Sequence, residues 1–249
     1  MSEQPWFKDW FNTTYYHNLY FNRDETEASN FIDTLIKKLH PPSLSTMLDV
    51  ACGKGRHSRR LQQDGFDVTG IDLAEDSILE AKKSENEHLR FYVHDMRLPF
   101  IINYFDYAFN FFTSFGYFKT RREHDNAIRT IAQSIKLNGT FVMDYLNTHY
   151  AEDHLVHTNE KQIEGVNYFI TKWYDETHFY KKIIVEDETQ EQPFEYIEKV
   201  SKFTLGDFTD MFSYQGLQIQ EIYGDYQLNS YNVKTSPRLI MIAKKVKEG

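Results

Sequence analysis

Apolar and polar positions follow two different periods along the first 150 residues. Residues 25–39 place apolar side chains at helical spacing, and the His40-Pro41-Pro42 run predicts that this helix stops there. A second helix is predicted over about 121–136, with Asn138-Gly139 as its end signal. The apolar runs that predict strands lie at 47–50, 66–73, 89–96, 104–112 and 140–146. Strands that alternate with helices indicate a mostly parallel sheet with helices on both faces.

The pattern changes after Tyr150. Residues from about 165 to 203 alternate aromatic and β-branched residues with polar ones, which predicts two or three antiparallel strands. Helical spacing returns at 204–212, and two further strands are predicted at 217–223 and 238–243. We therefore divide the chain into an aromatic amino-terminal segment, a Rossmann-like core, an inserted antiparallel β region and a carboxyl-terminal completion of the core. These parts span 1–24, 25–150, 151–203 and 204–249.

The most informative stretch is residues 47–58, where a buried strand runs into a glycine loop and then a helix. Gly53 and Gly55 let the backbone approach a ligand closely, and the helix that follows offers free N–H groups and a positive dipole end. A dinucleotide-binding loop has a third glycine where this chain has Ser58, so the NAD fingerprint is incomplete. Asp49 lies inside the strand instead, where it can hold water or an ammonium group.

Acidic residues also close the next two predicted strands. Asp72 is placed to accept hydrogen bonds from both hydroxyls of a ribose. Asp95 can bind an adenine amino group, and Met96 can cover the ring. Each of these residues also has a purely structural interpretation as a tight turn or a helix cap, and Asp95 as a turn residue before Pro99. The functional interpretation is favoured because such groups recur at the ends of successive strands.

Four segments carry motifs in a characteristic order along the chain. They are Leu-Asp-Val-Ala-Cys-Gly-Lys-Gly-Arg-His-Ser at 48–58, Gly-Ile-Asp-Leu at 70–73, His-Asp-Met at 94–96 and Phe-Asp-Tyr-Ala-Phe-Asn at 105–110. This series resembles the class I S-adenosylmethionine-dependent methyltransferases over roughly residues 45–148, and more loosely over the last forty residues. The first motif is specific for this family, whereas each later motif is weak alone and supports the resemblance only because the motifs occur in this order.

The resemblance implies a Rossmann-like α/β fold with a seven-stranded, mostly parallel sheet, and an inserted antiparallel region that covers the substrate site. It implies S-adenosyl-L-methionine as cofactor and assigns the cofactor-binding residues one by one. Asp49, Gly53 and Gly55 would shape the methionine pocket, Asp72 would bind the ribose, Asp95 and Met96 the adenine, and Asn110 would lie near the methyl group, with Ala51 and Leu73 beside these residues.

The amino-terminal segment is rich in aromatic residues, which predicts that it packs on another part of the molecule. These residues are Trp6, Phe7, Trp10, Phe11, Tyr15, Tyr16, Tyr20 and Phe21. A lid over the cofactor and an anchor in a surface groove are equally compatible with this composition. Tyr16 is the residue of this segment that we expect to contact cofactor or substrate. No catalytic residue can be assigned, and the candidates are Tyr16, Tyr117, Asn147 and His149.

Composition narrows the class of partner. The chain has 28 basic and 37 acidic residues, which argues against nucleic acid and favours a small-molecule acceptor. No apolar stretch is long enough to cross a bilayer, the amino terminus lacks the features of a signal peptide, and the single cysteine, Cys52, excludes an internal disulfide. We expect a cytoplasmic protein without a metal site. The oligomeric state cannot be predicted.

The function that the sequence favours is methyl transfer from S-adenosylmethionine to nitrogen or oxygen of a small molecule. Two alternatives stay open. One is a protein that binds S-adenosylmethionine without catalysis, and the other is an NAD-dependent oxidoreductase, against which Ser58 argues.

Overall fold

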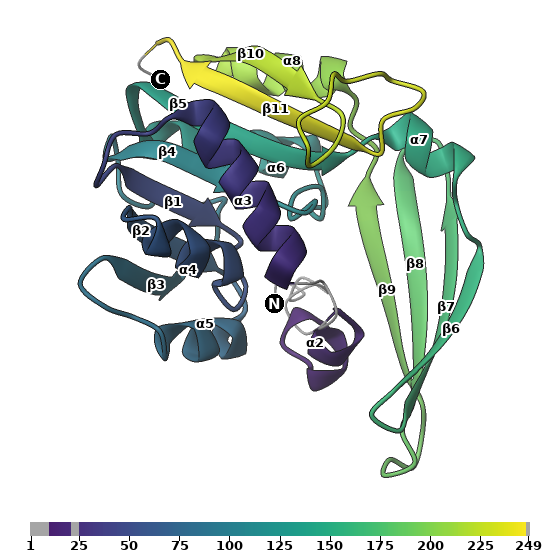
Figure 1. Cartoon of the computed structure of the whole chain (residues 1–249). Helices are drawn as coiled ribbons and strands as arrows, with labels where there is room; N and C mark the ends of the chain where they lie inside the picture. Colours follow the sequence, from purple (N-terminus) through teal and green to yellow (C-terminus); the bar gives the residue numbers. More distant parts are fainter. Residues whose placement is uncertain (1–9, 21–24, 248–249) are drawn as a thin grey trace.

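The computed structural model describes residues 10–20 and 25–247 (Figure 1). Seven strands form one sheet in the order β10-β11-β5-β4-β1-β2-β3. They are β1 (Thr46–Val50), β2 (Asp67–Asp72), β3 (Leu89–Val93), β4 (Phe105–Asn110), β5 (Ile135–Leu146), β10 (Leu217–Tyr223) and β11 (Arg238–Lys245). The five neighbouring strands β5, β4, β1, β2 and β3 are parallel to one another. Strand β11 pairs antiparallel with both β5 and β10. The seven-stranded, mostly parallel sheet predicted above is confirmed.

Helices cover both faces of this sheet, because its strands are apolar on both sides. The helices are α3 (Glu25–Leu39), α4 (Arg56–Gln63), α5 (Glu75–Lys82), α6 (Arg121–Ser134) and α8 (Leu205–Tyr214). One face packs against α6 and α8, and the other against α3, α4 and α5. Neighbouring residues of β1 alternate accordingly, since Leu48 belongs to the first cluster and Met47 to the second.

A second, antiparallel sheet follows the short helix α7 (Thr148–Asp153). Its strands are β6 (Thr158–Ile163), β7 (Val166–Tyr174), β8 (His178–Glu186) and β9 (Phe194–Ser201), in sequential order. The prediction of two or three antiparallel strands from about 165 to 203 is confirmed by β7, β8 and β9, but it did not include β6, which precedes that range. The strand it missed, β6, is polar and almost fully exposed, so it lacks the alternation that reveals the other three.

The boundary between α6 and β5 also differs from the prediction. The helix was expected to reach residue 136 and the strand to begin at 140, but α6 ends at Ser134 and β5 begins at Ile135. Ile135 pairs with Phe105 of β4, and the register then shifts before Tyr107 pairs with Thr140. Asn138 has a left-handed backbone, so it marks this irregularity inside the strand rather than the end of the helix.

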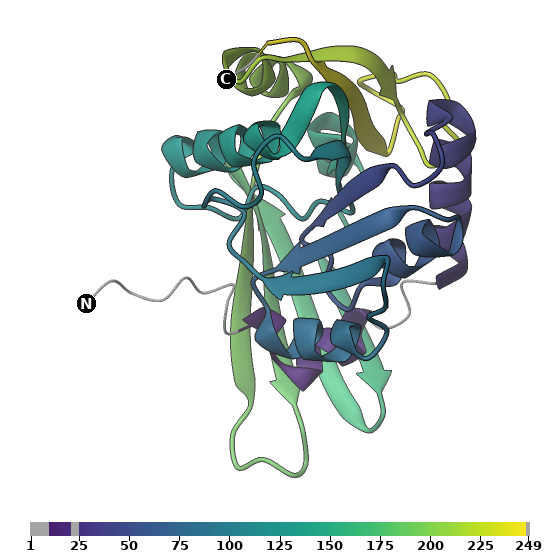
Figure 2. The same ribbon diagram turned by 90° about the vertical axis from the view of Figure 1, so that its left-hand side faces the viewer.

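The helix α2 (Thr14–Tyr20) lies between the second sheet and the core (Figure 1). Trp10 and Leu19 pack on the inner face of the second sheet, and the Asn12 side chain accepts a hydrogen bond from the Asp76 N–H at the start of α5. In the turned view the second sheet runs behind the core and extends below it (Figure 2). Trp6, Phe7 and Phe21 of the aromatic segment lie outside the described residues.

Candidate cofactor and acceptor site

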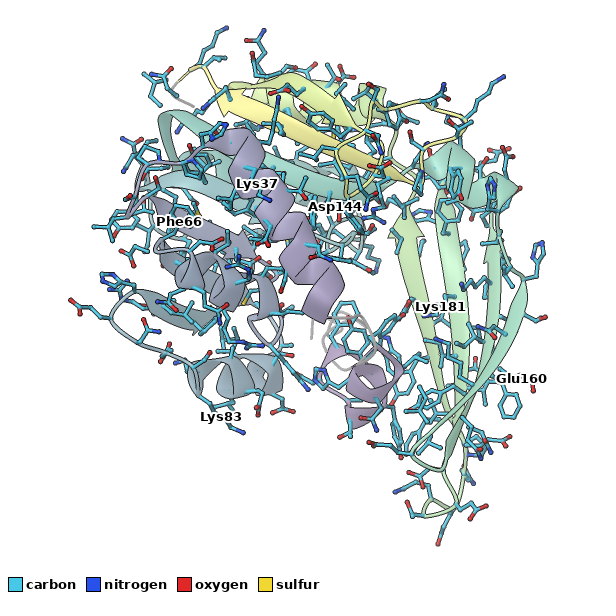
Figure 3. All side chains as sticks on the ribbon, viewed as in Figure 1. Lys37, Phe66, Lys83, Asp144, Glu160 and Lys181 are labelled. Atoms are coloured by element: carbon cyan, nitrogen blue, oxygen red, sulfur yellow. The ribbon has the colours of Figure 1, made fainter. Side chains whose placement is uncertain are left out.

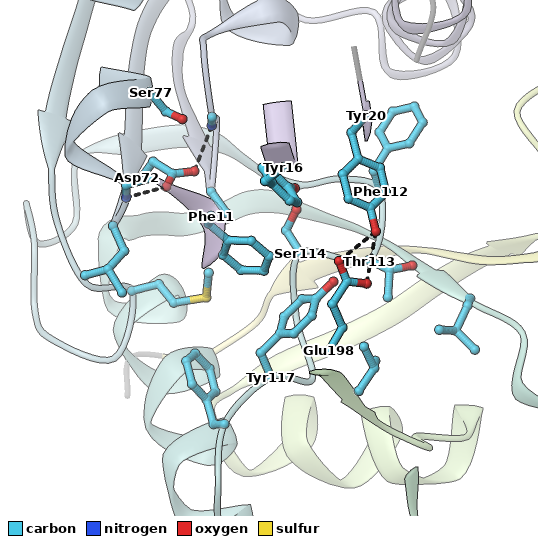
Figure 4. A pocket seen from close by; sticks show the side chains of 18 of the residues that line it. Phe11, Tyr16, Tyr20, Asp72, Ser77, Phe112, Thr113, Ser114, Tyr117 and Glu198 are labelled. Carbon is cyan, nitrogen blue, oxygen red and sulfur yellow. Dashed lines mark hydrogen bonds between the residues drawn. The ribbon is translucent and has the colours of Figure 1, made fainter. Parts of the chain in front are cut away.

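A cavity of about 580 Å³ lies where the carboxyl ends of the parallel strands face the second sheet and α2. This volume is in the range of small-molecule sites. The predicted residues that line it are Tyr16, Ala51, Gly53, Asp72, Leu73, Asp95, Met96 and Tyr117. Asp72 lies on one side of the cavity and Glu198 on the other, with Phe11, Tyr16 and Tyr117 between them (Figure 4).

Asp72 ties the end of β2 to the glycine loop. One carboxylate oxygen accepts a hydrogen bond from the Gly53 N–H at 2.8 Å, and the other accepts one from the Ala74 N–H at 2.8 Å. Burial raises the pKa of this carboxyl group, while these backbone donors oppose the rise. Each oxygen of a carboxylate has a second lone pair, so both retain capacity for donors in the cavity.

The two glycines of the loop have different structural roles. Gly53 has φ +54°, and the position of a Cβ atom there is empty, which leaves the backbone open to the cavity. Gly55 has φ +77°, and a Cβ atom there would lie 2.5 Å from Cζ of Phe91. Gly55 therefore lets the loop pack on β3, and it does not line the cavity.

Asp49 lies beneath the glycine loop and is almost completely buried, with 1% of its surface exposed. The Ser58 hydroxyl donates to its Oδ2 at 2.6 Å. Burial raises the pKa of Asp49 to about 6, although the Ser58 hydrogen bond lowers it. Ser58 thus has a specific partner where a dinucleotide loop has glycine, a role that the sequence analysis missed.

Asn110 also lies below the cavity surface rather than on it. Its Nδ2 donates to the Val50 carbonyl oxygen at 3.0 Å, which joins β4 to the end of β1. Its buried Oδ1 has no hydrogen-bond partner among the described residues. The predicted position near the methyl group stays a prediction.

Asp95 lines the cavity, but its charge already has a partner. Arg97 donates to both carboxylate oxygens, at 2.7 Å to Oδ2 from Nη2, and its backbone N–H closes a turn on Oδ1. Burial disfavours the ionised form of Asp95, but the Arg97 hydrogen bonds outweigh it and lower the pKa. The structural interpretation of Asp95 as a turn residue therefore applies, and contact with adenine remains a prediction.

The wall of the cavity opposite the glycine loop belongs to the second sheet. Glu198 of β9 accepts hydrogen bonds from Nε1 of Trp10 at 2.8 Å and from the Tyr20 hydroxyl at 2.7 Å. Lys181 of β8 lies 3.6 Å from the same carboxylate, and Lys172 of β7 also lines the wall. No sequence motif marks these residues, so the sequence analysis did not find them.

A buried ion pair supports the loop that follows β4. Asp144 is fully buried and accepts from Arg238 Nε at 2.7 Å and from the Phe112 N–H at 2.8 Å. Phe112 and Thr113 both have left-handed backbones, with φ of 56° and 60°, and the Arg238 guanidinium also donates to the Thr113 hydroxyl. This network holds the loop against the cavity.

Two catalytic candidates do not reach the cavity. The Asn147 amide is buried and donates to the carbonyl oxygens of Val233 and Ser236 at 2.8 Å, so it holds the loop before β11. His149 is exposed on α7. Both residues follow β5 closely in sequence, but the chain turns into α7 and leads them away. The structure therefore corrects these two assignments and retains Tyr16 and Tyr117.

Within residues 10–20 and 25–247, no group of three or more histidine, cysteine, aspartate or glutamate side chains could hold a metal ion. In the same part of the chain, no helix has the length and hydrophobicity required to span a membrane.

Residues 47–139 match a family model described as a methyltransferase domain, which covers the glycine loop and β1 to β4. Residues 47–139 are therefore a methyltransferase domain. The fold agrees, because a solved S-adenosylmethionine-dependent methyltransferase from Clostridium acetobutylicum superimposes with a TM-score of 0.77 at 18% identity over 94% of this chain and 96% of that one.

Among relatives, a dTDP-3-amino-3,4,6-trideoxy-alpha-D-glucopyranose N,N-dimethyltransferase from Streptomyces venezuelae is 30% identical over 118 residues. That alignment covers 47% of this chain and 48% of the relative, so the chain matches about half of the relative's length. A Geobacillus protein named as a methyltransferase is 22% identical over 93% of this chain and 97% of its own.

Proposed function

We propose that the protein transfers a methyl group from S-adenosylmethionine to a nitrogen or oxygen atom of a small-molecule acceptor. The observation that carries the proposal is that the glycine loop and Asp72 line one side of a cavity whose opposite, polar wall is formed by the inserted sheet. Cofactor and acceptor can therefore meet in one enclosed space. We keep the four-part division of the chain and the site residues that line the cavity as parts of this proposal.

The bound cofactor supplies an activated methyl group, so the protein has to orient the acceptor and exclude water. Phe11 stands between the two retained tyrosines, with ring centroids 4.9 Å from Tyr16 and 5.4 Å from Tyr117. These rings form an apolar boundary between the two ends of the cavity (Figure 4). An amine has to be neutral to attack, and removal from water favours its neutral form without a dedicated base.

Nitrogen is the acceptor atom that we favour. The relative from Streptomyces venezuelae methylates an amino sugar by its name, and a structural neighbour from Micromonospora echinaspora is an amino pentose methyltransferase solved with S-adenosylmethionine bound. That neighbour has a TM-score of 0.69 at 18% identity, and the alignment covers 94% of this chain and 97% of its own. The matches offer no support for an NAD-dependent oxidoreductase or for a binder without catalysis.

The cytoplasm is the compartment that we propose. Cys52 is a free, buried thiol, and such a thiol suits a reducing compartment.

The test is formation of S-adenosylhomocysteine in the presence of amino sugars and their nucleotide-linked forms, measured by mass spectrometry. We expect turnover with at least one amine acceptor. Asp72→Ala should abolish it, whereas Asp67→Ala, at the other end of β2 and paired with Arg90, should keep it. Tight cofactor binding without turnover on any acceptor would contradict the catalytic proposal and favour the non-catalytic alternative.

A further inference from the structure

The inner face of the second sheet carries three cross-strand rows next to one another. The first row, Ile170, Ile183 and Tyr196, packs on Trp10 and α2. The second row pairs Lys172 with Lys181, and Lys181 with Glu198. The third row, Tyr174, Phe179 and Val200, is again apolar. A charged row thus lies between two apolar rows, and all three of its members line the cavity.

The charges in this row do not balance. Glu198 is 8% exposed and is already bound by Trp10 and Tyr20, with Lys181 within ion-pair distance. Lys181 also donates to the Tyr20 hydroxyl, whose ring lies 4.3 Å below its ammonium group. One lysine is therefore sufficient to neutralise this carboxylate.

Lys172 adds a second positive charge directly across from Lys181. It forms no ion pair with any carboxylate in the described parts of the chain, and it is half-buried. Like charges directly opposite each other destabilise a sheet, and partial removal from water adds to that cost. A bound anion would offset both costs, because hydrogen bonds between ammonium and oxyanion groups are strong.

The position of this row fits an acceptor subsite. Asp72 lies on one side of the cavity and Glu198 on the other (Figure 4). Lys181, the cross-strand neighbour of Glu198, lies on the second sheet (Figure 3). We propose that Lys172 and Lys181 bind an oxyanion group, a phosphate or a carboxylate, on the methyl acceptor. The acceptor is then an acidic small molecule whose nucleophilic atom lies toward the aromatic rings and whose anion lies on the second sheet. This inference rests on the proposed function, since it assigns part of the same cavity to the acceptor.

The experiment is calorimetric titration of the protein with inorganic pyrophosphate and, separately, with glutarate. Both titrations are run with and without S-adenosylhomocysteine, and binding of S-adenosylhomocysteine is measured first. Failure of that binding would count against the proposed function, whereas the anion titrations test the two lysines in either state. Tighter pyrophosphate binding would indicate a phosphate on the acceptor, and tighter glutarate binding a carboxylate.

The variants are Lys172→Met, Lys172→Arg and, as a matched control, Lys199→Met. Lys199 is an exposed residue of β9 on the opposite face of the same sheet, paired with Tyr180. We expect saturable binding of at least one anion and a loss of at least about tenfold in Lys172→Met, or about 1.4 kcal/mol. Lys172→Arg should retain most of the affinity, and Lys199→Met all of it.

Two results would overturn the inference. One is the absence of saturable binding for both anions in the wild type. The other is affinity that stays unchanged in Lys172→Met, or that falls equally in the control. Unfolding midpoints of all variants, measured by circular dichroism, separate a local loss of binding from a loss of structure.

Discussion

Replacement of the buried carboxyl group beneath the glycine loop should change how stability depends on pH. Burial raises the pKa of Asp49 from 3.8 to about 6, so the folded protein binds this proton more tightly than the unfolded chain does. The stabilisation of the folded state by the protonated Asp49 carboxyl group is fully present below about pH 4 and is lost as the pH rises through about 6. At 1.36 kcal/mol for each pH unit between the two pKa values, the loss amounts to about 3 kcal/mol.

The Asp49→Asn variant lacks this titration but keeps an oxygen that can accept from Ser58. Relative to the wild type, its free energy of unfolding should therefore increase by about 3 kcal/mol between pH 4 and pH 8. Urea unfolding at both pH values measures the difference. Asp95→Asn serves as the control, because Arg97 lowers the pKa of Asp95 and its contribution to stability is lost only below about pH 4; this variant should therefore change little relative to the wild type between pH 4 and pH 8.

The same titration should affect cofactor binding. If the ionised Asp49 carboxylate attracts the positively charged end of the cofactor, affinity for S-adenosylmethionine should rise with pH through about 6 in the wild type. The Asp49→Asn variant should show little of this rise. Parallel pH profiles of stability for wild type and variant would refute the assignment of a raised pKa to Asp49.

Two further substitutions test the packing around the site. Gly55→Ala should destabilise the protein clearly more than Gly65→Ala, because both glycines have positive φ but only a Cβ atom at Gly55 meets the Phe91 ring. Thermal unfolding measures the difference, and equal losses of stability in the two variants would contradict this explanation. Arg238→Met should cost about 3–5 kcal/mol in urea unfolding because it leaves Asp144 buried and unpaired. Asp144→Asn in the same chain should recover much of this loss, and no recovery would show that packing, not charge, is responsible.

The core of the fold could be predicted because its signals are local. The strand, glycine loop and helix from Met47 onward follow from apolar runs and from two glycines, and the parallel sheet follows from the alternation of strands and helices. The errors arose where tertiary contacts decide the conformation. Ile135 leaves α6 to pair with Phe105, and the polar strand β6 forms because β7 lies beside it.

The same distinction holds for the site. Gly53 and Asp72 were found because the backbone chemistry of a loop and the end of a strand are visible in the sequence. Glu198 and Lys172 were not, because three antiparallel strands bring them to the cavity and no spacing along the chain records this. His149 was placed at the cavity because it follows β5 closely in sequence, but the chain turns into α7 there and carries this residue away from the cavity.

The central claim is that the cavity binds S-adenosylmethionine, and the most direct measurement is calorimetric titration of the wild type with S-adenosylmethionine, S-adenosylhomocysteine and NAD. The account predicts micromolar binding of both adenosyl compounds and no heat from NAD. Asp72→Ala should weaken the adenosyl compounds at least about tenfold, since it removes the acceptor of the ribose hydroxyls. Binding of NAD alone, or of none of the three compounds, would contradict the account.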